Sequence, residues 1–191
     1  SAASDVYKRQ DYGHEGVVVA IRSNLRWCSD GFEFTCWNGE VVRGAFIIDA
    51  HDREIIAFAA VANAGISGSH IRDIMLEAVE TRFGGIRAIT PVEMLSDNGS
   101  AYTARETRTF ARQLGLKPCF TPVRSPQSNG ISEAFVHTLK RDYVRVSPLP
   151  DALTALTSLA RWIEDYNDNH PHSGLKMRSP REHRALVSAT A

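Results

Sequence analysis

The chain has 191 residues, with 22 Lys and Arg against 22 Asp and Glu, so its formal net charge is zero. This length predicts one domain, and the 43% hydrophobic and 23% charged content argues against a disordered or low-complexity protein. No apolar run approaches the ~18 residues of a membrane-spanning helix, so no membrane partner is expected. Three cysteines without C-x-x-C spacing indicate reduced thiols in a cytosol, and they match neither a disulfide framework nor a zinc finger.

The zero net charge hides an uneven distribution along the chain. Residues 1–104 carry 9 basic and 14 acidic side chains, whereas residues 105–191 carry 13 basic and 8 acidic ones. An acidic half joined to a basic half is compatible with a carboxylate metal site beside a phosphate-binding surface. The alternative is a chance distribution over two solvated faces.

The first residues differ in character from the rest. Residues 1–10 have no apolar period, and Asp5–Gln10 resembles the translation of an adapter used in transposase-made sequencing libraries. We therefore expect a non-native, adapter-derived or disordered segment there. Residues 11–26 are expected to be a lead-in, residues 27–185 a single core domain, and residues 186–191 a tail.

Three strands are predicted first. Trp27–Phe34 is aromatic-rich and is followed by Asn38-Gly39, a strong hairpin signal. Val41–Asp49 and Glu54–Val61 are apolar, β-branched runs separated by a polar turn. Together they predict an antiparallel three-stranded meander.

Helices and strands then alternate along the chain. Periodicity and end signals predict a helix through Ile71–Phe83, with Ser67 or Ser69 as N-cap and Gly84 after it, and then a strand Val92–Ser96. The next helix is opened by the capping box Thr103-x-x-Glu106 and ends before Gly115, and a strand Leu116–Thr121 follows it. After a turn-rich loop Arg124–Gly130 we expect helices Ile131–Val146 and Ala152–Asn167, the second capped by Asp151. The helical crossovers make the last two strands parallel to the first. The expected fold is α/β and ribonuclease-H-like, a mixed five-stranded sheet with helices on both faces.

Three acidic residues occupy positions that this fold brings together. Asp30 lies within the first strand, Asp97 ends the fourth, and Glu133 lies in the first turn of the helix after the fifth. Three clustered carboxylates repel one another unless a cation joins them. Mg²⁺ or Mn²⁺ prefers oxygen ligands, and two such ions could hold the attacking and leaving oxygens of a phosphodiester.

The helix that carries Glu133 is predicted to be amphipathic. At about 100° per residue, Ile131 and Phe135 lie on a core face, while Glu133, His137 and Lys140 share the opposite face. This arrangement favours a carboxylate beside groups that can bind phosphate. An ordinary solvated face with Glu–Lys neighbours is the alternative.

At these residues the sequence resembles a known family. The three acids are separated by 66 and 35 residues, and they stand in the motifs Ser96-Asp97-Asn98-Gly99-Ser100-x-Tyr102 and Ser125–Glu133. These features are similar to the DDE integrase core, in particular that of OrfB transposases of insertion-sequence family three, which are relatives of retroviral integrases. Further segments match the same pattern: Thr138–Tyr143, Tyr166-Asn167, His170–Leu175 and Arg178–Glu182.

The resemblance implies a Mg²⁺-dependent polynucleotidyl transferase that performs 3′-end cleavage and strand transfer in DNA transposition. Asp30, Asp97 and Glu133 would be both the catalytic residues and the ligands of two Mg²⁺ ions, with Mn²⁺ able to substitute. The residues expected to contact DNA are Lys140, Arg141, Gln127, Asn129, His137 and Arg124.

Partners follow from the same resemblance. They are DNA, as element ends and as target, and further copies of the chain, because two ends must be joined. The helix-turn-helix region that precedes the core in this family is expected to be missing from these residues, and the bacterial cytoplasm, with association to the nucleoid during action, is the expected location.

Two other functions stay open on the sequence alone. One is a ribonuclease-H-like nuclease that hydrolyses without joining. The other is a domesticated, non-catalytic DNA-binding protein, which would normally have lost one of the three carboxylates.

Overall fold

The computed structural model describes residues 20–121 and 129–190. Its strands are β1 (Arg26–Thr35), β2 (Val41–Asp49), β3 (Ile55–Ala62), β4 (Val92–Ser96) and β5 (Leu116–Phe120). Its helices are α2 (Gly68–Phe83), α3 (Ser100–Thr103), α4 (Arg105–Gln113), α5 (Gly130–Thr138), the π-helix η2 (Leu139–Val144), α6 (Ala152–Asn169), the 3₁₀-helix η3 (Ser173–Leu175) and α7 (Pro180–Ala189).

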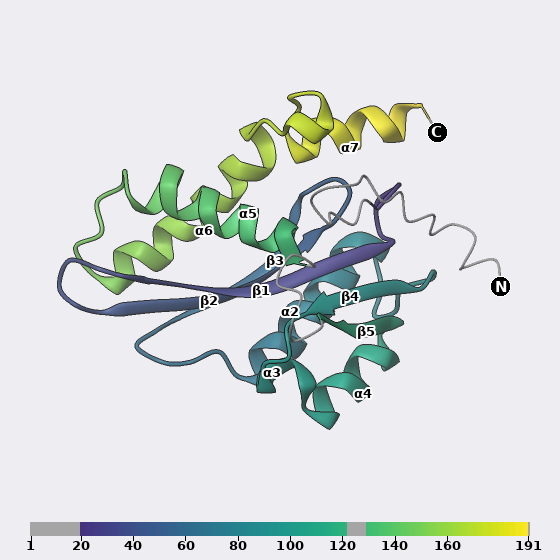
Figure 1. Ribbon diagram of the computed structural model, residues 1–191, viewed down its shortest axis with the longest axis horizontal. Coiled ribbons are helices and arrows are strands. Elements are labelled where there is room, and N and C mark those ends of the chain that lie inside the picture. Colours follow the sequence, from purple (N-terminus) through teal and green to yellow (C-terminus); the bar gives the residue numbers. More distant parts are fainter. Residues whose placement is uncertain (1–19, 122–128, 191) are drawn as a thin grey trace.

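The strands form one mixed sheet in the order β3-β2-β1-β4-β5 (Figure 1). The first three strands pair antiparallel, and β4 and β5 run parallel to β1. The predicted ribonuclease-H-like α/β fold is thereby confirmed. Because the chain crosses over from the edge strand β3 through α2 to β4, the first and fourth strands become neighbours at the centre of the sheet.

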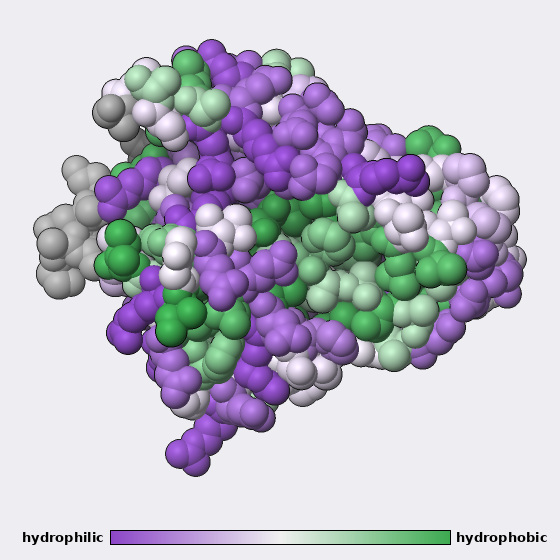
Figure 2. Space-filling view, turned by 180° about the vertical axis from the view of Figure 1, so that it is seen from behind, coloured by the Kyte–Doolittle hydropathy of each residue, from purple (hydrophilic) through white to green (hydrophobic). Residues whose placement is uncertain are grey.

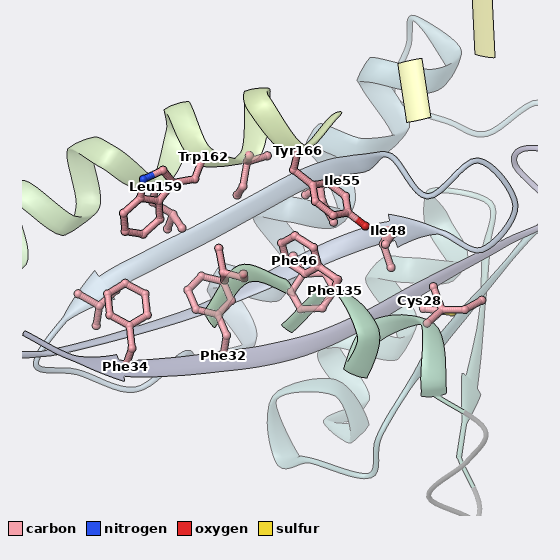
Figure 3. Close-up of a cluster of buried hydrophobic side chains, with 14 of the residues drawn as sticks. Cys28, Phe32, Phe34, Phe46, Ile48, Ile55, Phe135, Leu159, Trp162 and Tyr166 are labelled. Carbon is pink, nitrogen blue, oxygen red and sulfur yellow. The ribbon is translucent and has the colours of Figure 1, made fainter. Parts of the chain in front are cut away.

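Helices cover both faces of the sheet. Successive strand residues point to opposite faces, so Phe46 joins a core under α5 and α6 while Ile47 joins a second core under α2 and α4. In the first core the ring of Phe135 meets Phe46 edge-on at 4.6 Å and Tyr166 at 5.0 Å between ring centroids (Figure 3). These contacts dock α5, the helix that carries Glu133, onto the sheet.

One edge of the sheet stays partly open. β3 is apolar along its whole length, and only its first three residues are fully buried. In the view from behind, apolar side chains gather in a band bordered by hydrophilic ones (Figure 2). No helix in residues 20–121 or 129–190 combines the length and hydrophobicity needed to cross a membrane.

Most predicted end signals are confirmed. α2 follows the N-cap Ser67 and ends at Gly84, which adopts φ 72°, the left-handed conformation that glycine takes without steric cost. Asp151 caps α6 by accepting a hydrogen bond from the Thr154 amide at 2.7 Å. Cys28 and Cys36 are buried free thiols, and Cys119 is a partly exposed one.

Two predicted helices differ from the structure. The capping box Thr103-x-x-Glu106 is wrong: Thr103 ends the short helix α3, and Ala104 precedes α4 without a side-chain cap. The reason is the buried ring of Tyr102, which holds an extra helical turn directly after the Asp97–Gly99 turn. The expected α-helix Ile131–Val146 also divides, because α5 widens into the π-helix η2, where the Arg145 amide donates to the Lys140 carbonyl.

Candidate active site

Asp30 and Asp97 lie level with each other on neighbouring strands. β1 and β4 pair in parallel with Cys28 opposite Leu95, so the same register continued by two residues brings Asp30 beside Asp97. Both carboxylates then project at the end of β4, where the parallel pairing stops. The side-by-side placement expected from the strand order is present.

The three acids share one electrostatic environment. Burial raises the pKa of Asp30 above its ordinary value, the Gly31 amide lowers it, and the negative charges of Asp97 and Glu133 raise it further. Burial also raises the pKa of Tyr102, and the charges of Asp30 and Asp97 add to that increase. Asp97 and Glu133 therefore lie close enough for their charges to act on Asp30.

A tight turn fixes the carboxylate of Asp97. Its Oδ1 accepts a hydrogen bond from the Gly99 amide at 2.7 Å, and Asp30 Oδ1 accepts one from the Gly31 amide at 2.8 Å. A Cβ atom at position 99 would stand 2.8 Å from Asp97 Oδ1, too close for any side chain without movement. Glycine at position 99 thus permits the turn that presents this carboxylate.

Helix α5 presents its predicted faces. In α5, Ile131 and Phe135 are buried and Glu133 and His137 are exposed, and Lys140 is exposed in the adjoining η2. The docking of Phe135 on the sheet therefore sets the rotation of α5 that turns Glu133 outward. The expected amphipathic arrangement is confirmed for these five residues.

Two open hollows meet beside the acids. One, of about 290 Å³, includes Asp30, Asp97 and Tyr102 in its lining. The other, of about 360 Å³, is lined in part by Lys140, and both hollows include Gly31. Lys140 therefore stands at a surface that adjoins the acids through the exposed Gly31.

The remaining predicted DNA-contact residues have different surroundings. Arg141 is exposed and forms an ion pair with Asp142 at 2.7 Å. Asn129 is buried, and its side-chain amide donates to the Ser29 carbonyl at 3.4 Å, so in this conformation it contacts the protein itself. Gln127 and Arg124 lie outside the described residues.

The three carboxylates are donors that suit a hard divalent cation, although their side chains do not converge on one point. Among residues 20–121 and 129–190, no three His, Cys, Asp or Glu side chains converge to metal-binding distances. Within the same ranges, no ion pair involves Asp30, Asp97 or Glu133. Asp97 and Glu133, whose charges raise the pKa of Asp30, provide with it three carboxylates of the oxygen-donor kind that Mg²⁺ binds.

The sequence interpretation missed two groups of contacts. Ser29 precedes Asp30 and is hydrogen-bonded to Tyr102 at 2.9 Å, but nothing in the local pattern signals a pair 73 positions apart. A second group of acids, Asp49, Asp52 and Glu54, surrounds Arg82. The turn that contains Asp52 reads as an ordinary polar turn in the sequence, so it offers no signal for that cluster.

Comparison with known proteins identifies the family. The family model described as Integrase core domain matches residues 20–126, and a second model with the same description matches residues 114–180. The chain belongs to the integrase core domain family. It is a transposase/integrase catalytic core, a class of polynucleotidyl transferase.

Two bacterial relatives illustrate this membership. This integrase core is 72% identical over 169 residues to an uncharacterized protein of insertion element IS136 from Agrobacterium fabrum, covering 88% of the chain and 87% of the relative. It is 55% identical over 170 residues to transposase InsD of insertion element IS2 from Escherichia coli. That alignment covers 89% of the chain and only 56% of InsD, so the chain spans about half the length of this relative.

Solved structures share the fold. A chain of the simian T-cell lymphotropic virus intasome, in complex with a PP2A regulatory subunit, superposes with a TM-score of 0.67 at 18% identity, covering 87% of this integrase core and 56% of that chain. The HTLV-2 integrase catalytic core domain in complex with magnesium gives a TM-score of 0.60 at 16% identity, with coverage of 85% and 98%. At these identities the likeness establishes the ribonuclease-H-like architecture.

Proposed function

We propose that this integrase core cleaves the 3′ ends of an insertion element and joins them to target DNA, with Asp30, Asp97 and Glu133 as the ligands of two Mg²⁺ ions. The observation that carries the proposal is the electrostatic environment of the three carboxylates. The charges of Asp97, in the turn after β4, and of Glu133, in α5, raise the pKa of Asp30 in β1, and none of the three acids has an ion-pair partner in the described ranges. A divalent cation would relieve this repulsion.

Backbone amides of the chain orient the two aspartates that would bind the metal ions. Bound Mg²⁺ would supply Lewis-acid stabilisation of charge on the oxygens of a phosphodiester, and Mn²⁺ would substitute for it. Asp97 is held for this purpose by the Gly99 amide, and Asp30 by the Gly31 amide. Because each aspartate is already oriented, little conformational freedom is lost when a ligand binds.

DNA would cross the surface beside the acids. Lys140, next to the hollows at Gly31, would contact a phosphate, and His137 and Arg141 are exposed along the same helical segment. Arg124 and Gln127 are proposed contacts from their sequence motif alone. Asn129 would contribute by holding the start of α5 against β1, since its amide already donates to Ser29.

The working assembly would contain more than one copy. Two ends must be joined in one reaction, and one structural relative is described as part of an intasome. Recognition of the element ends would come from a helix-turn-helix region outside these residues, consistent with a chain that spans 56% of InsD. We further propose that the protein associates with the nucleoid when it acts.

A branched DNA tests the chemistry without requiring end recognition. Strand transfer is reversible in principle, so a substrate that mimics the joined product should be resolved into a rejoined target strand and a released end in the presence of Mg²⁺. Asp97→Asn should reduce this activity by at least about a hundredfold, since it removes a ligand that serves the transition state. The exposed helical residue Asp73 provides the matched control, and Asp73→Asn should leave the rate unchanged.

The products separate the possible functions. A rejoined strand that depends on Asp97 supports the proposal. Cleavage with no rejoined strand would indicate a nuclease that hydrolyses only, and DNA binding with no Mg²⁺-dependent product would indicate a non-catalytic protein.

A further inference from the structure

Ser29 connects β1, which carries Asp30, with α3, which follows Asp97, and with the N-cap of α5, which carries Glu133. It precedes Asp30 in β1 and has no exposed surface. Its Oγ donates to the Phe46 carbonyl on β2 at 2.7 Å and lies 2.9 Å from the Tyr102 hydroxyl. A serine hydroxyl has one proton, which here goes to Phe46, so the Tyr102 hydroxyl must be the donor to Ser29.

The same residue also contacts the start of α5. The backbone carbonyl of Ser29 accepts the hydrogen bond from the Asn129 side-chain amide. Tyr102 follows Asp97 by five residues, and Asn129 precedes Glu133 by four. One buried residue is therefore joined to the helix that follows Asp97 and to the N-cap of the helix that carries Glu133.

The sheet alone does not hold these elements together at the acids. The parallel pairing of β1 with β4 runs from Arg26 opposite Glu93 to Cys28 opposite Leu95 and ends there. Asp30 and Asp97 lie beyond that last pair, where no ladder hydrogen bond fixes their separation. The link from Ser29 to Tyr102 is formed at this point.

We propose that Ser29 is the positioning residue of the acid site, which sets the separation of Asp30, Asp97 and Glu133 through Tyr102 and Asn129. This inference rests on the proposed function and adds to it the contacts that bring the ligands together. A residue with this role affects how tightly the carboxylates hold a cation. A residue that only stabilises the fold changes the free energy of unfolding and nothing else.

Removal of one hydroxyl isolates the link. Tyr102→Phe keeps the buried ring and leaves Ser29 bonded to Phe46. The Mg²⁺ concentration that gives half of the metal-induced rise in melting temperature should increase about fivefold, the effect of one hydrogen bond. Ser29→Ala should raise it similarly, and the double variant should show no more than the larger single effect, because both changes remove the same interaction.

Tyr143 offers the matched control. Its hydroxyl donates to Asp165 at 2.7 Å, between η2 and α6, so Tyr143→Phe deletes the same group from another part of the molecule. This variant should lose stability without a change in the Mg²⁺ midpoint. Equal midpoints for Tyr102→Phe, Tyr143→Phe and the unsubstituted protein would overturn the positioning role.

A second measurement needs neither metal nor catalysis. The amides of Gly31 and Gly99 are hydrogen-bonded to the carboxylates of Asp30 and Asp97, so their hydrogen exchange reports the order of each carboxylate. Tyr102→Phe should accelerate exchange at Gly99, and Tyr143→Phe should not. If the unsubstituted protein shows no response to Mg²⁺, the proposed function fails, while unchanged exchange at Gly99 in Tyr102→Phe refutes the positioning role independently.

Discussion

Two groups of three acids lie in or beside the same sheet, and their surroundings differ. Asp49, Asp52 and Glu54 meet at the turn from β2 to β3, where the Arg82 guanidinium lies 3.2 Å from Asp49 and 3.0 Å from Asp52. The side chains of Arg82, Asp49 and Asp52 are completely buried. Asp97 and Glu133 of the other cluster are exposed, and their charges act on a partly buried Asp30.

The difference teaches how to distinguish structural acids from ligand acids. The cluster around Arg82 is satisfied internally, since backbone amides of Asn24 and His51 also donate to Asp49. The cluster around Asp30 receives amides but has no ion pair within the described ranges. In the proposed metal site, a bound Mg²⁺ would balance this charge.

The largest effect is expected when Arg82 is removed. Arg82→Met leaves the buried Asp49 without its ion-pair partner and leaves Asp52 with only Arg184, 3.7 Å away, which should lower the free energy of unfolding by about 3–5 kcal/mol. Urea denaturation measures this change. Arg43→Met, which breaks the exposed pair with Glu33, should cost less than about 1 kcal/mol, and equal losses for the two variants would remove the distinction between buried and exposed pairs.

An Asp→Asn substitution should lower the stability of the metal-free protein in one cluster and leave it unchanged or raise it in the other. Asp49→Asn removes a partner of Arg82 and should destabilise the metal-free protein by about 1–3 kcal/mol. Asp97→Asn removes a repelling charge, so the midpoint of urea denaturation without metal should stay constant or rise. A clear loss of stability in metal-free Asp97→Asn would mean that this acid also serves the fold.

Mg²⁺ should stabilise the folded protein only by binding to the acids around Asp30. At a Mg²⁺ concentration about five times the dissociation constant, binding should add about 1 kcal/mol to the free energy of unfolding, and chelation should remove that gain. Asp97→Asn should abolish the shift in melting temperature, whereas Arg43→Met should retain it. A shift that survives in Asp97→Asn would place the metal elsewhere.

The smallest effect concerns pH at the cluster around Arg82. His183 lies 3.0 Å from His51 between their Nε2 atoms, and burial, followed by the charge of His51, lowers the pKa of His183. The imidazole of His183 therefore binds a proton more readily in the unfolded chain than in the folded protein. The free energy of unfolding should be highest above about pH 6.5 and should decline as the pH falls toward the lowered pKa of His183. The decline should be less than about 1 kcal/mol, because the ring is partly exposed.

His183→Gln isolates that contribution. The variant should show a smaller loss of stability than the unsubstituted protein when urea midpoints at pH 7.5 and pH 5 are compared, values on either side of about 6.5. His137→Gln, an exposed change on α5, serves as the control and should leave the difference intact. An identical pH response in both variants would assign the decline to other groups.

Several features of the fold could be predicted because they depend on neighbours in the sequence. Val41–Asp49 and Val92–Ser96 form strands with the predicted bounds, since their apolar, β-branched runs are stopped by turn residues. The Asp151 cap and the two faces of α5 follow from spacings of three or four residues. The choice of Asp30, Asp97 and Glu133 as metal ligands rests on motif spacing and stays a prediction, although in the structure the charges of Asp97 and Glu133 act on Asp30.

The sequence by itself thus determined the order of the five strands and of the longer helices through α6, most of their ends and the acids worth testing, because periodicity, capping and turn chemistry act over a few residues. It did not predict the short helices α3 and η3 or the C-terminal helix α7. Only the tertiary structure decided that Thr103 ends a helix, that Arg82 neutralises acids 30 and 33 positions away, and that Tyr102 reaches Ser29 across 73 positions. Each of these results depends on which distant side chains share a buried space. Hydrogen bonds and ion pairs gain their strength there from the exclusion of water, a condition that no local pattern encodes.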